Sequence, residues 1–165
     1  MEAVYIPHLT KAPEQTQVIQ VQESLPDLET LTPIRGRIQV QHHGNYLEVL
    51  AQAEAIITLT CHRCLQQYNH RLALDTSEMI WLEESSEPDE GPLEREITVD
   101  ELVETLPPQG YFHPSEWLYE QLCLAIPQRQ LCDAQCAGIQ TATQEGSVQL
   151  DYRWASLEAL KRQLP

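Results

Sequence analysis

Residues 55–64 join a strand-like run to a closely spaced pair of cysteines, Ala55-Ile56-Ile57-Thr58-Leu59-Thr60-Cys61-His62-Arg63-Cys64. The first six residues are rich in β-branched side chains, which favour strands. The first cysteine pair (Cys61 and Cys64) is therefore predicted at a strand end. The two residues between these cysteines can form a tight turn that directs both sulfurs toward one metal ion.

A second cysteine pair (Cys132 and Cys136) follows the first after a spacer of 67 residues. Together the pairs supply the four sulfurs of a tetrahedral structural zinc site. The spacer exceeds the roughly 15–20 residues between the halves of a compact zinc ribbon, so we expect the site to join distant parts of the fold. Four thiolates leave no open position for water, so such a zinc ion would be structural and not hydrolytic.

Two other interpretations of the cysteines stay open. They could be buried or incidental thiols, because free cysteine is among the most buried residue types. They could also include a redox Cys-x-x-Cys, although that motif normally opens a helix within a βαβ unit and no such pattern surrounds Cys61. The fifth cysteine, Cys123, lies inside a predicted helix and is interpreted as a small apolar filler.

Alternating polar and apolar residues predict strands in the first half of the chain. These strands cover residues 17–22, 34–41, 46–50, 55–60, 68–74 and 79–82. Helices are predicted from Thr98 to the prolines at 107 and 108, from a Ser115 cap to Pro127, and over about 153–163. The predicted fold class is α+β: a largely antiparallel β-sheet or partial barrel followed by C-terminal helices, with the two cysteine pairs joining the halves.

The chain is acidic, with a formal net charge of −15 over 165 residues. Residues 83–104 hold ten acidic side chains and one basic side chain. This charge disfavours a broad electrostatic grip on nucleic acid and suits a basic partner, such as a ribosomal protein. A local phosphate-contacting patch near the cysteines is a further possibility, although ordinary surface arginines are the alternative; its candidates are Arg35, Arg37, Arg63, Arg71, Arg129 and Arg153.

Length and composition predict one domain over residues 1–165, with an ill-ordered N-terminal segment at about 1–15 and an acidic loop at about 83–97. We find no apolar stretch of membrane-spanning length and no secretory signal, which predicts a cytoplasmic protein. We find neither a Gly-rich phosphate loop nor a serine nucleophile elbow. The expectation is a protein that is not an enzyme and takes no small-molecule substrate.

Three stretches of the chain, in this order, resemble signatures of the YceD family, the large ribosomal RNA subunit accumulation proteins. The first, residues 58–65, is similar to the family's strand that ends in Cys-x-Arg-Cys-Leu. The second, residues 120–138, resembles its Leu-x-Leu-Ala-Leu-Pro segment followed by Cys-x-x-x-Cys-x-Gly. The third, residues 151–157, resembles its Asp-Pro-Arg-Trp-Ala-x-Leu signature, although Tyr152 replaces the proline and no further cysteine follows Gly138.

The resemblance implies a non-enzymatic factor in ribosome synthesis that is needed for large-subunit (23S) rRNA to accumulate in the bacterial cytoplasm. It also implies Cys61, Cys64, Cys132 and Cys136 as the minimal ligand set. The expected partners are ribosomal proteins or assembly factors of the large subunit, with indirect or local rRNA contact. Two competing interpretations are a metal-independent acidic adaptor and, behind it, a thiol redox protein.

Overall fold

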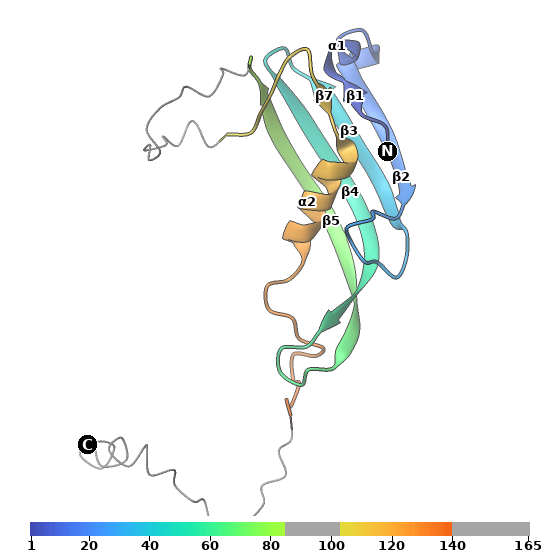
Figure 1. The fold of residues 1–165 in the computed structure, drawn as a ribbon, viewed down its shortest axis with the longest axis vertical. Coiled ribbons are helices and arrows are strands. Elements are labelled where there is room, and N and C mark those ends of the chain that lie inside the picture. The colour runs from blue at the N-terminus through green and yellow to red at the C-terminus, as the bar shows by residue number, and fades with distance from the viewer. Residues whose placement is uncertain (85–102, 140–165) are drawn as a thin grey trace, which may run out of the picture.

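The computed structural model describes residues 1–84 and 103–139 (Figure 1). Its main body is a five-stranded sheet with the strand order β2-β3-β4-β5-β6. The strands are β2 (Thr16–Glu23), β3 (Ile34–His42), β4 (Tyr46–Thr60), β5 (Gln67–Leu82) and β6 (Thr105–Leu106). Strands β2 to β5 run antiparallel to their neighbours, and β6 runs parallel to β5.

The longest structural unit is the hairpin of β4 and β5, which pairs without interruption from Tyr46 and Trp81 to Thr60 and Gln67. The sequence predicted two short strands in place of each arm of this hairpin, 46–50 and 55–60 for β4 and 68–74 and 79–82 for β5. The predicted breaks within the arms are wrong. Alternate side chains of β4 are buried from Leu47 to Leu59, and the buried positions include its alanines. The strand therefore continues through them. The polar centre of β5 stays extended because β4 pairs with it along its whole length, and such pairing overrides weak local propensity.

The sheet is mixed and open, so the prediction of a largely antiparallel sheet is confirmed for β2 to β5 and the partial barrel is not seen in residues 1–84 and 103–139. The helix predicted from Thr98 to the prolines is wrong at its end, because Thr105–Leu106 forms β6. The Trp81 amide donates to the Glu104 carbonyl (3.0 Å), and the Glu83 amide donates to the Leu106 carbonyl (3.0 Å). These hydrogen bonds stabilise an extended backbone beside β5.

One helix, α2 (Pro114–Ala125), packs on one face of the sheet (Figure 1). The face that contacts α2 is the inner face, and the opposite face is the outer face. Its side chains Trp117, Leu118 and Leu122 are buried in the core. The predicted helix that stops before Pro127 is confirmed, but its N-cap is His113 and not Ser115. Pro114 occupies the first turn, where its missing N–H costs no helical hydrogen bond.

The N-terminus also packs against the core. Strand β1 (Val4–Tyr5) pairs with β7 (Tyr111–Phe112), and α1 (Ile6–Leu9) and η1 (Pro13–Gln15) follow. In place of the ill-ordered segment expected over residues 1–15, the structure has this folded strap, with Val4, Ile6 and Leu9 buried.

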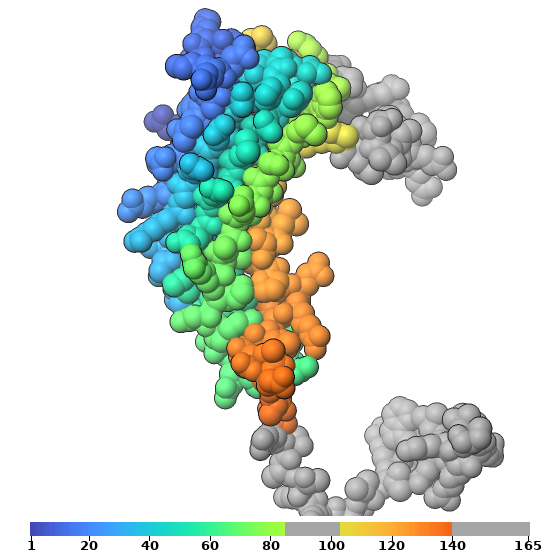
Figure 2. All heavy atoms as spheres, turned by 180° about the vertical axis from the view of Figure 1, so that it is seen from behind, coloured from blue at the N-terminus to red at the C-terminus, as the bar shows by residue number. Residues whose placement is uncertain are grey.

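The opposite face of the sheet carries no helix in the part of the chain that the structure describes (Figure 2). No helix there is long and apolar enough to cross a membrane. Most of the predicted acidic loop at 83–97 and the predicted helix at 153–163 lie outside the described residues. Both remain predictions, as does the single domain over residues 1–165.

Candidate metal centre

The first cysteine pair lies in the tight turn between β4 and β5, directly after Thr60, so its predicted place at a strand end is confirmed. The Cys61 amide donates to the Gln66 carbonyl (2.9 Å), and the Leu65 amide donates back to the Cys61 carbonyl (2.9 Å). Leu65 closes the turn with a positive φ of 61°. The turn holds Cys61, which is fully buried, and Cys64, which is half-buried.

The second cysteine pair reaches the same place because the chain after α2 runs down to this turn (Figure 1). The His62 amide donates to the Gln130 carbonyl (2.8 Å), and the Gln130 amide donates to His62 Nδ1 (3.4 Å). Asp133 then turns the chain, because its side chain accepts from the Gln135 amide (2.7 Å) and its carbonyl from the Cys136 amide (3.1 Å). His62 therefore ties two segments together.

The structure brings all four predicted cysteines together, and their sulfur atoms lie within 4.8 Å of one another. Cys61 Sγ lies 3.8 Å from Cys136 Sγ, and Cys64 Sγ lies 3.7 Å from Cys132 Sγ. A tetrahedral zinc ion with Zn–S bonds of about 2.3 Å separates its sulfurs by about 3.8 Å. The donor set and its spacing therefore fit a tetrahedral ion, and the four side chains could hold a metal.

The pKa values of Cys61 and Cys132 are shifted in opposite directions. Backbone N–H groups, first that of Cys132 and then that of Cys64, donate to the Cys61 sulfur and lower the pKa of Cys61 to about 6. Hydrogen bonding to the neighbouring sulfurs, first that of Cys136, raises the pKa of Cys132 to about 12. Cys61 thus ionises more readily than an ordinary thiol, whereas Cys132 resists ionisation, a resistance that a bound cation would remove.

Two residues outside the predicted ligand set support the cluster. The Arg63 guanidinium donates to the Cys136 carbonyl (3.1 Å), and the Arg63 amide contacts Cys61 Sγ (3.4 Å). Gly138 has a φ of +77°, and a side chain there would come within 3.5 Å of the Arg63 carbonyl. Both residues belong to the signatures that carry the family resemblance, but those signatures did not indicate that the residues support the cluster.

Cys123 lies on α2, and the four-cysteine group does not include it. Its side chain is half-buried, and it contacts Tyr119, whose pKa it raises through a hydrogen bond to the phenol. Its predicted role as a filler inside a helix is consistent with this position.

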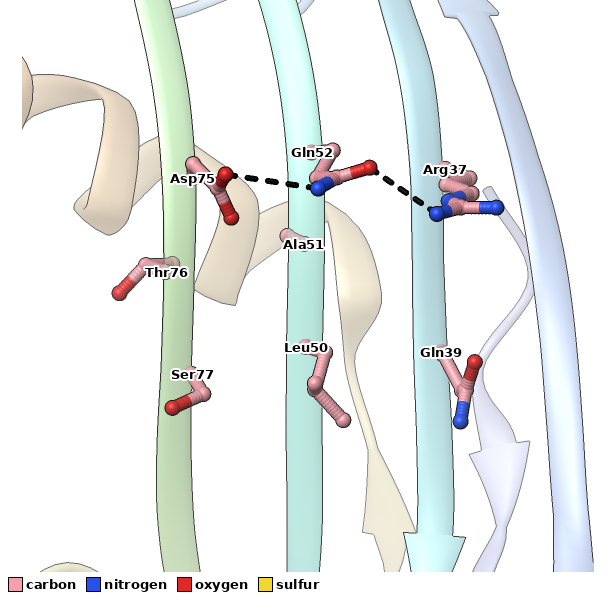
Figure 3. Close-up of a pocket in the computed structure, with 8 residues that line it drawn as sticks. All are labelled: Arg37, Gln39, Leu50, Ala51, Gln52, Asp75, Thr76 and Ser77. Carbon is pink, nitrogen blue, oxygen red and sulfur yellow. Dashed lines mark hydrogen bonds between the residues drawn. The ribbon is translucent and has the colours of Figure 1, made fainter.

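The arginines do not form one patch around the cysteines. Arg35, Arg37 and Arg71 project from the outer face of the sheet, whereas Arg63 and Arg129 lie in the cysteine-bearing segments. A groove of about 330 Å³ lies on the outer face. Figure 3 shows its lining residues, among which Arg37 donates to Gln52 (3.0 Å) and Gln52 donates to Asp75 (3.4 Å). Arg71 forms an ion pair with Glu54. Arg153 lies outside the described residues.

The helix side of the molecule is acidic. A groove of about 420 Å³ between α2 and the segment before β3 is lined by Leu25, Pro26, Asp27, Ser115, Glu116, Tyr119 and Glu120. On the other flank of α2, Glu78 accepts hydrogen bonds from Trp117 Nε1 (2.5 Å) and Gln121 Nε2 (2.9 Å). Partial burial raises the pKa of Glu104, and the charges of Glu78 and Glu120 raise it further. Carboxylates therefore flank α2 on both sides.

Comparison with known proteins identifies the family. The family model described as "Large ribosomal RNA subunit accumulation protein YceD" matches residues 49–161. No curated protein and no solved structure matches the chain significantly. The matched region includes both cysteine pairs, β5 and α2, and it covers well over half of the sequence. The chain belongs to the YceD family.

Proposed function

We propose that Cys61, Cys64, Cys132 and Cys136 hold one structural zinc ion. The observation that carries this proposal is the convergence of four sulfurs within 4.8 Å from two segments far apart in the sequence. Zinc would supply the positive charge that lets neighbouring thiolates coexist, and a closed four-sulfur shell would leave it without a catalytic role. Thiolate sulfurs are soft ligands, which bind zinc in preference to magnesium or calcium.

The zinc ion would fasten the turn after β4 to the chain that follows α2. Structural zinc contributes on the order of 10 kcal/mol of folding free energy in small peptides. Even part of that contribution is large against a domain stability of about 5–15 kcal/mol. The ion would thus fix residues 130–139, which otherwise contact the sheet mainly through the hydrogen bonds of His62 and Arg63.

We further propose that the protein is a non-enzymatic cytoplasmic factor that supports large-subunit rRNA accumulation by binding basic ribosomal or assembly proteins. The family name links this chain to large-subunit rRNA. The acidic flanks of α2 support a protein partner of opposite charge, since α2 itself contains no lysine or arginine. The net charge of −15 favours such a partner over a broad contact with RNA.

The function is tested by removing the protein from its source cell and restoring it on a plasmid. We expect the ratio of 23S to 16S rRNA to fall on removal and to recover with the wild-type protein. A Glu116→Gln, Glu120→Gln variant should recover less and should retain fewer large-subunit proteins in an affinity purification. The matched control is Glu48→Gln, Glu54→Gln on the outer face of the sheet, which keeps the acidic flanks of α2 intact.

An unchanged rRNA ratio after removal would contradict the proposed role. The metal assignment has a separate readout, elemental mass spectrometry on untagged protein. One zinc per chain supports the structural site, whereas metal-free protein with an intact rRNA effect would favour the metal-independent acidic adaptor.

A further inference from the structure

Within residues 1–84 and 103–139, no strand pairs with most of the outer edge of β5. Among the described strands, only β6 lies beside this edge, and it reaches only Trp81 and Leu82. Residues 67–80 therefore have β4 on one side and no described strand on the other. Figure 3 shows β5 as the outermost strand in view, with α2 behind it.

The hydrogen-bond pattern tells which residues direct their backbone groups toward this edge. Trp81 and Glu83 donate outward to the segment of β6, whereas Leu82 donates to Asn45 beside β4 (2.8 Å). The register between β4 and β5 has no interruption, and outward and inward residues alternate along an antiparallel strand. The odd-numbered residues from 67 to 79 therefore present their N–H and C=O groups to the open edge.

The charged side chains of β5 disfavour a neutral or acidic strand beside it, because Glu78 is an inward-pointing charge of the kind that protects an edge, but they leave a cationic strand possible. Residues 67–80 contain neither proline nor lysine, the residues that commonly protect an edge. The outward-facing side chains next to the edge are small at Ala73, Asp75 and Ser77. Figure 2 shows α2 extending past β5, so a strand added here would also lie against the helix.

The charges around the edge define the chemistry of an added strand. Asp75 lies on the outer face, and Glu78 lies on the inner face with Glu104 and Glu120 nearby. Arg71, the one arginine of β5, is already paired with Glu54. By contrast, the edge strand β2 has a single carboxylate, Glu23, which holds the N-terminal ammonium of Met1 (2.9 Å). A cationic strand therefore suits β5 better than β2.

We propose that an extended lysine- or arginine-rich segment of the protein partner adds to the sheet along residues 67–79 of β5. Main-chain hydrogen bonds to the odd-numbered residues would provide affinity. Alternate basic side chains would all lie on the outer face, where Asp75 is, while Glu78 on the inner face already accepts from Trp117 and Gln121. This inference rests on the proposed function, because it specifies how the basic partner binds.

The test uses the whole protein and a capped peptide of about eight alternating lysine and valine residues, the length of an ordinary strand. A second peptide of the same sequence carries N-methyl groups on alternate residues, which keep the charge but remove main-chain donors. We expect the first peptide to bind at least about tenfold more tightly, since several hydrogen bonds are lost in the second. Amide hydrogen exchange should slow at Ala73, Asp75 and Ser77 when the first peptide is added.

Two pairs of variants provide matched controls. Ser77→Pro removes an outward N–H without removing a bond to β4, so peptide binding should fall, whereas Ser77→Ala should bind like the wild type. Ala73→Lys should weaken binding by charge repulsion, whereas Ala73→Glu should preserve or strengthen it. A thermal melt of each variant checks that the sheet is intact.

Equal binding of both peptides, or slowed exchange confined to α2, would overturn the proposal in favour of nonspecific attraction to the acidic surface. Slowed exchange at the odd-numbered β5 amides that increases with protein concentration in the absence of peptide would also overturn it, because a second copy would then occupy the edge. The rRNA ratio separates this proposal from the proposed function. If Ser77→Pro loses the peptide but restores 23S rRNA fully, the edge is not the functional site and the proposed function stands.

Discussion

Arg63 lies between the cysteines of the first pair and contacts both cysteine-bearing segments. Its amide contacts the Cys61 sulfur, and its guanidinium donates to the Cys136 carbonyl. An arginine beside a cysteine pair can be interpreted from sequence as a phosphate contact. In the structure its exposed guanidinium donates to a carbonyl of the protein itself, which weakens the case for RNA binding at this end of the molecule.

The cysteine cluster yields the first prediction. A Cys61→Ser, Cys64→Ser variant should lose the proposed zinc ion, and its free energy of unfolding should fall by about 2 kcal/mol or more, because half of the ligand set is removed. The measurement is chemical denaturation combined with elemental analysis. Cys123→Ser is the matched control, since Cys123 lies on α2 outside the cluster and should keep both zinc and stability. Wild-type stability in the double variant would remove the structural role of the site.

Glu104 yields a prediction about pH. Its pKa in the folded protein is raised above the ordinary value of 4.5 by partial burial and then by Glu78 and Glu120. In the window above pH 4.5 the folded state therefore binds more protons than the unfolded state, and stability falls as pH rises through the folded pKa. Glu104→Gln should melt at a higher temperature than the wild type at pH 7, and this difference should shrink as the pH falls below 4.5.

The control for Glu104→Gln is Glu2→Gln, a change of the same charge at an exposed position outside α2. A general effect of net charge would raise the melting temperature of both variants equally. Such a result would mean that the carboxylates beside α2 do not repel one another in particular.

At the scale of elements, the sequence predicted the positions of most strand residues but not the length of the strands. Alanine is depleted in strands, so Ala51 and Ala53 concealed the continuity of β4. In β5 the polar centre at residues 75–78 concealed it in the same way. The two-residue strands β1, β6 and β7 depend on partners distant in the sequence, which local patterns do not contain.

The sequence predicted the residues of the cysteine cluster more completely than it predicted the strands of the sheet. Spacing alone grouped the four cysteines, because tight turns restrict how the sulfurs of each pair can point. The contacts of His62 with Gln130 and of Arg63 with Cys136 could not be predicted, since they arise only when the segment after α2 reaches the turn between β4 and β5.

Gly36 allows β3 to lie close to β4, which yields a prediction for the sheet. A Cβ atom at this position would lie 2.1 Å from the Gln52 carbonyl oxygen and 2.6 Å from Ala53 Cα. Because the obstacle is backbone, Gly36→Ala should lower the free energy of unfolding by about 1–3 kcal/mol. Gln22→Ala, at an exposed position of the adjacent strand, should change it little. An unchanged melt of Gly36→Ala would mean that β3 and β4 can separate at no cost.

The two faces of the sheet differ in charge. Arginines and carboxylates are balanced on the outer face of the sheet, where Arg35, Arg37 and Arg71 accompany Glu48, Glu54 and Asp75. On the side of α2 the carboxylates have no basic neighbour within the helix. A basic partner would therefore approach from the helix side, where the open edge of β5 also lies (Figure 2).

The last prediction concerns the connection between the two ends of this molecule. The core residues lie along β2 to β5 and under α2, whereas the cysteine cluster lies at the far end of the β4–β5 hairpin (Figure 1). Chelation of the proposed zinc ion should therefore release residues 130–139 and the turn at 61–66 without unfolding the strands near Leu47 and Ile80. Amide hydrogen exchange should accelerate in those two segments together, because His62 and Arg63 join them. Acceleration throughout the sheet would mean that the metal stabilises the whole fold, and no acceleration anywhere would mean that hydrogen bonds alone hold the two segments.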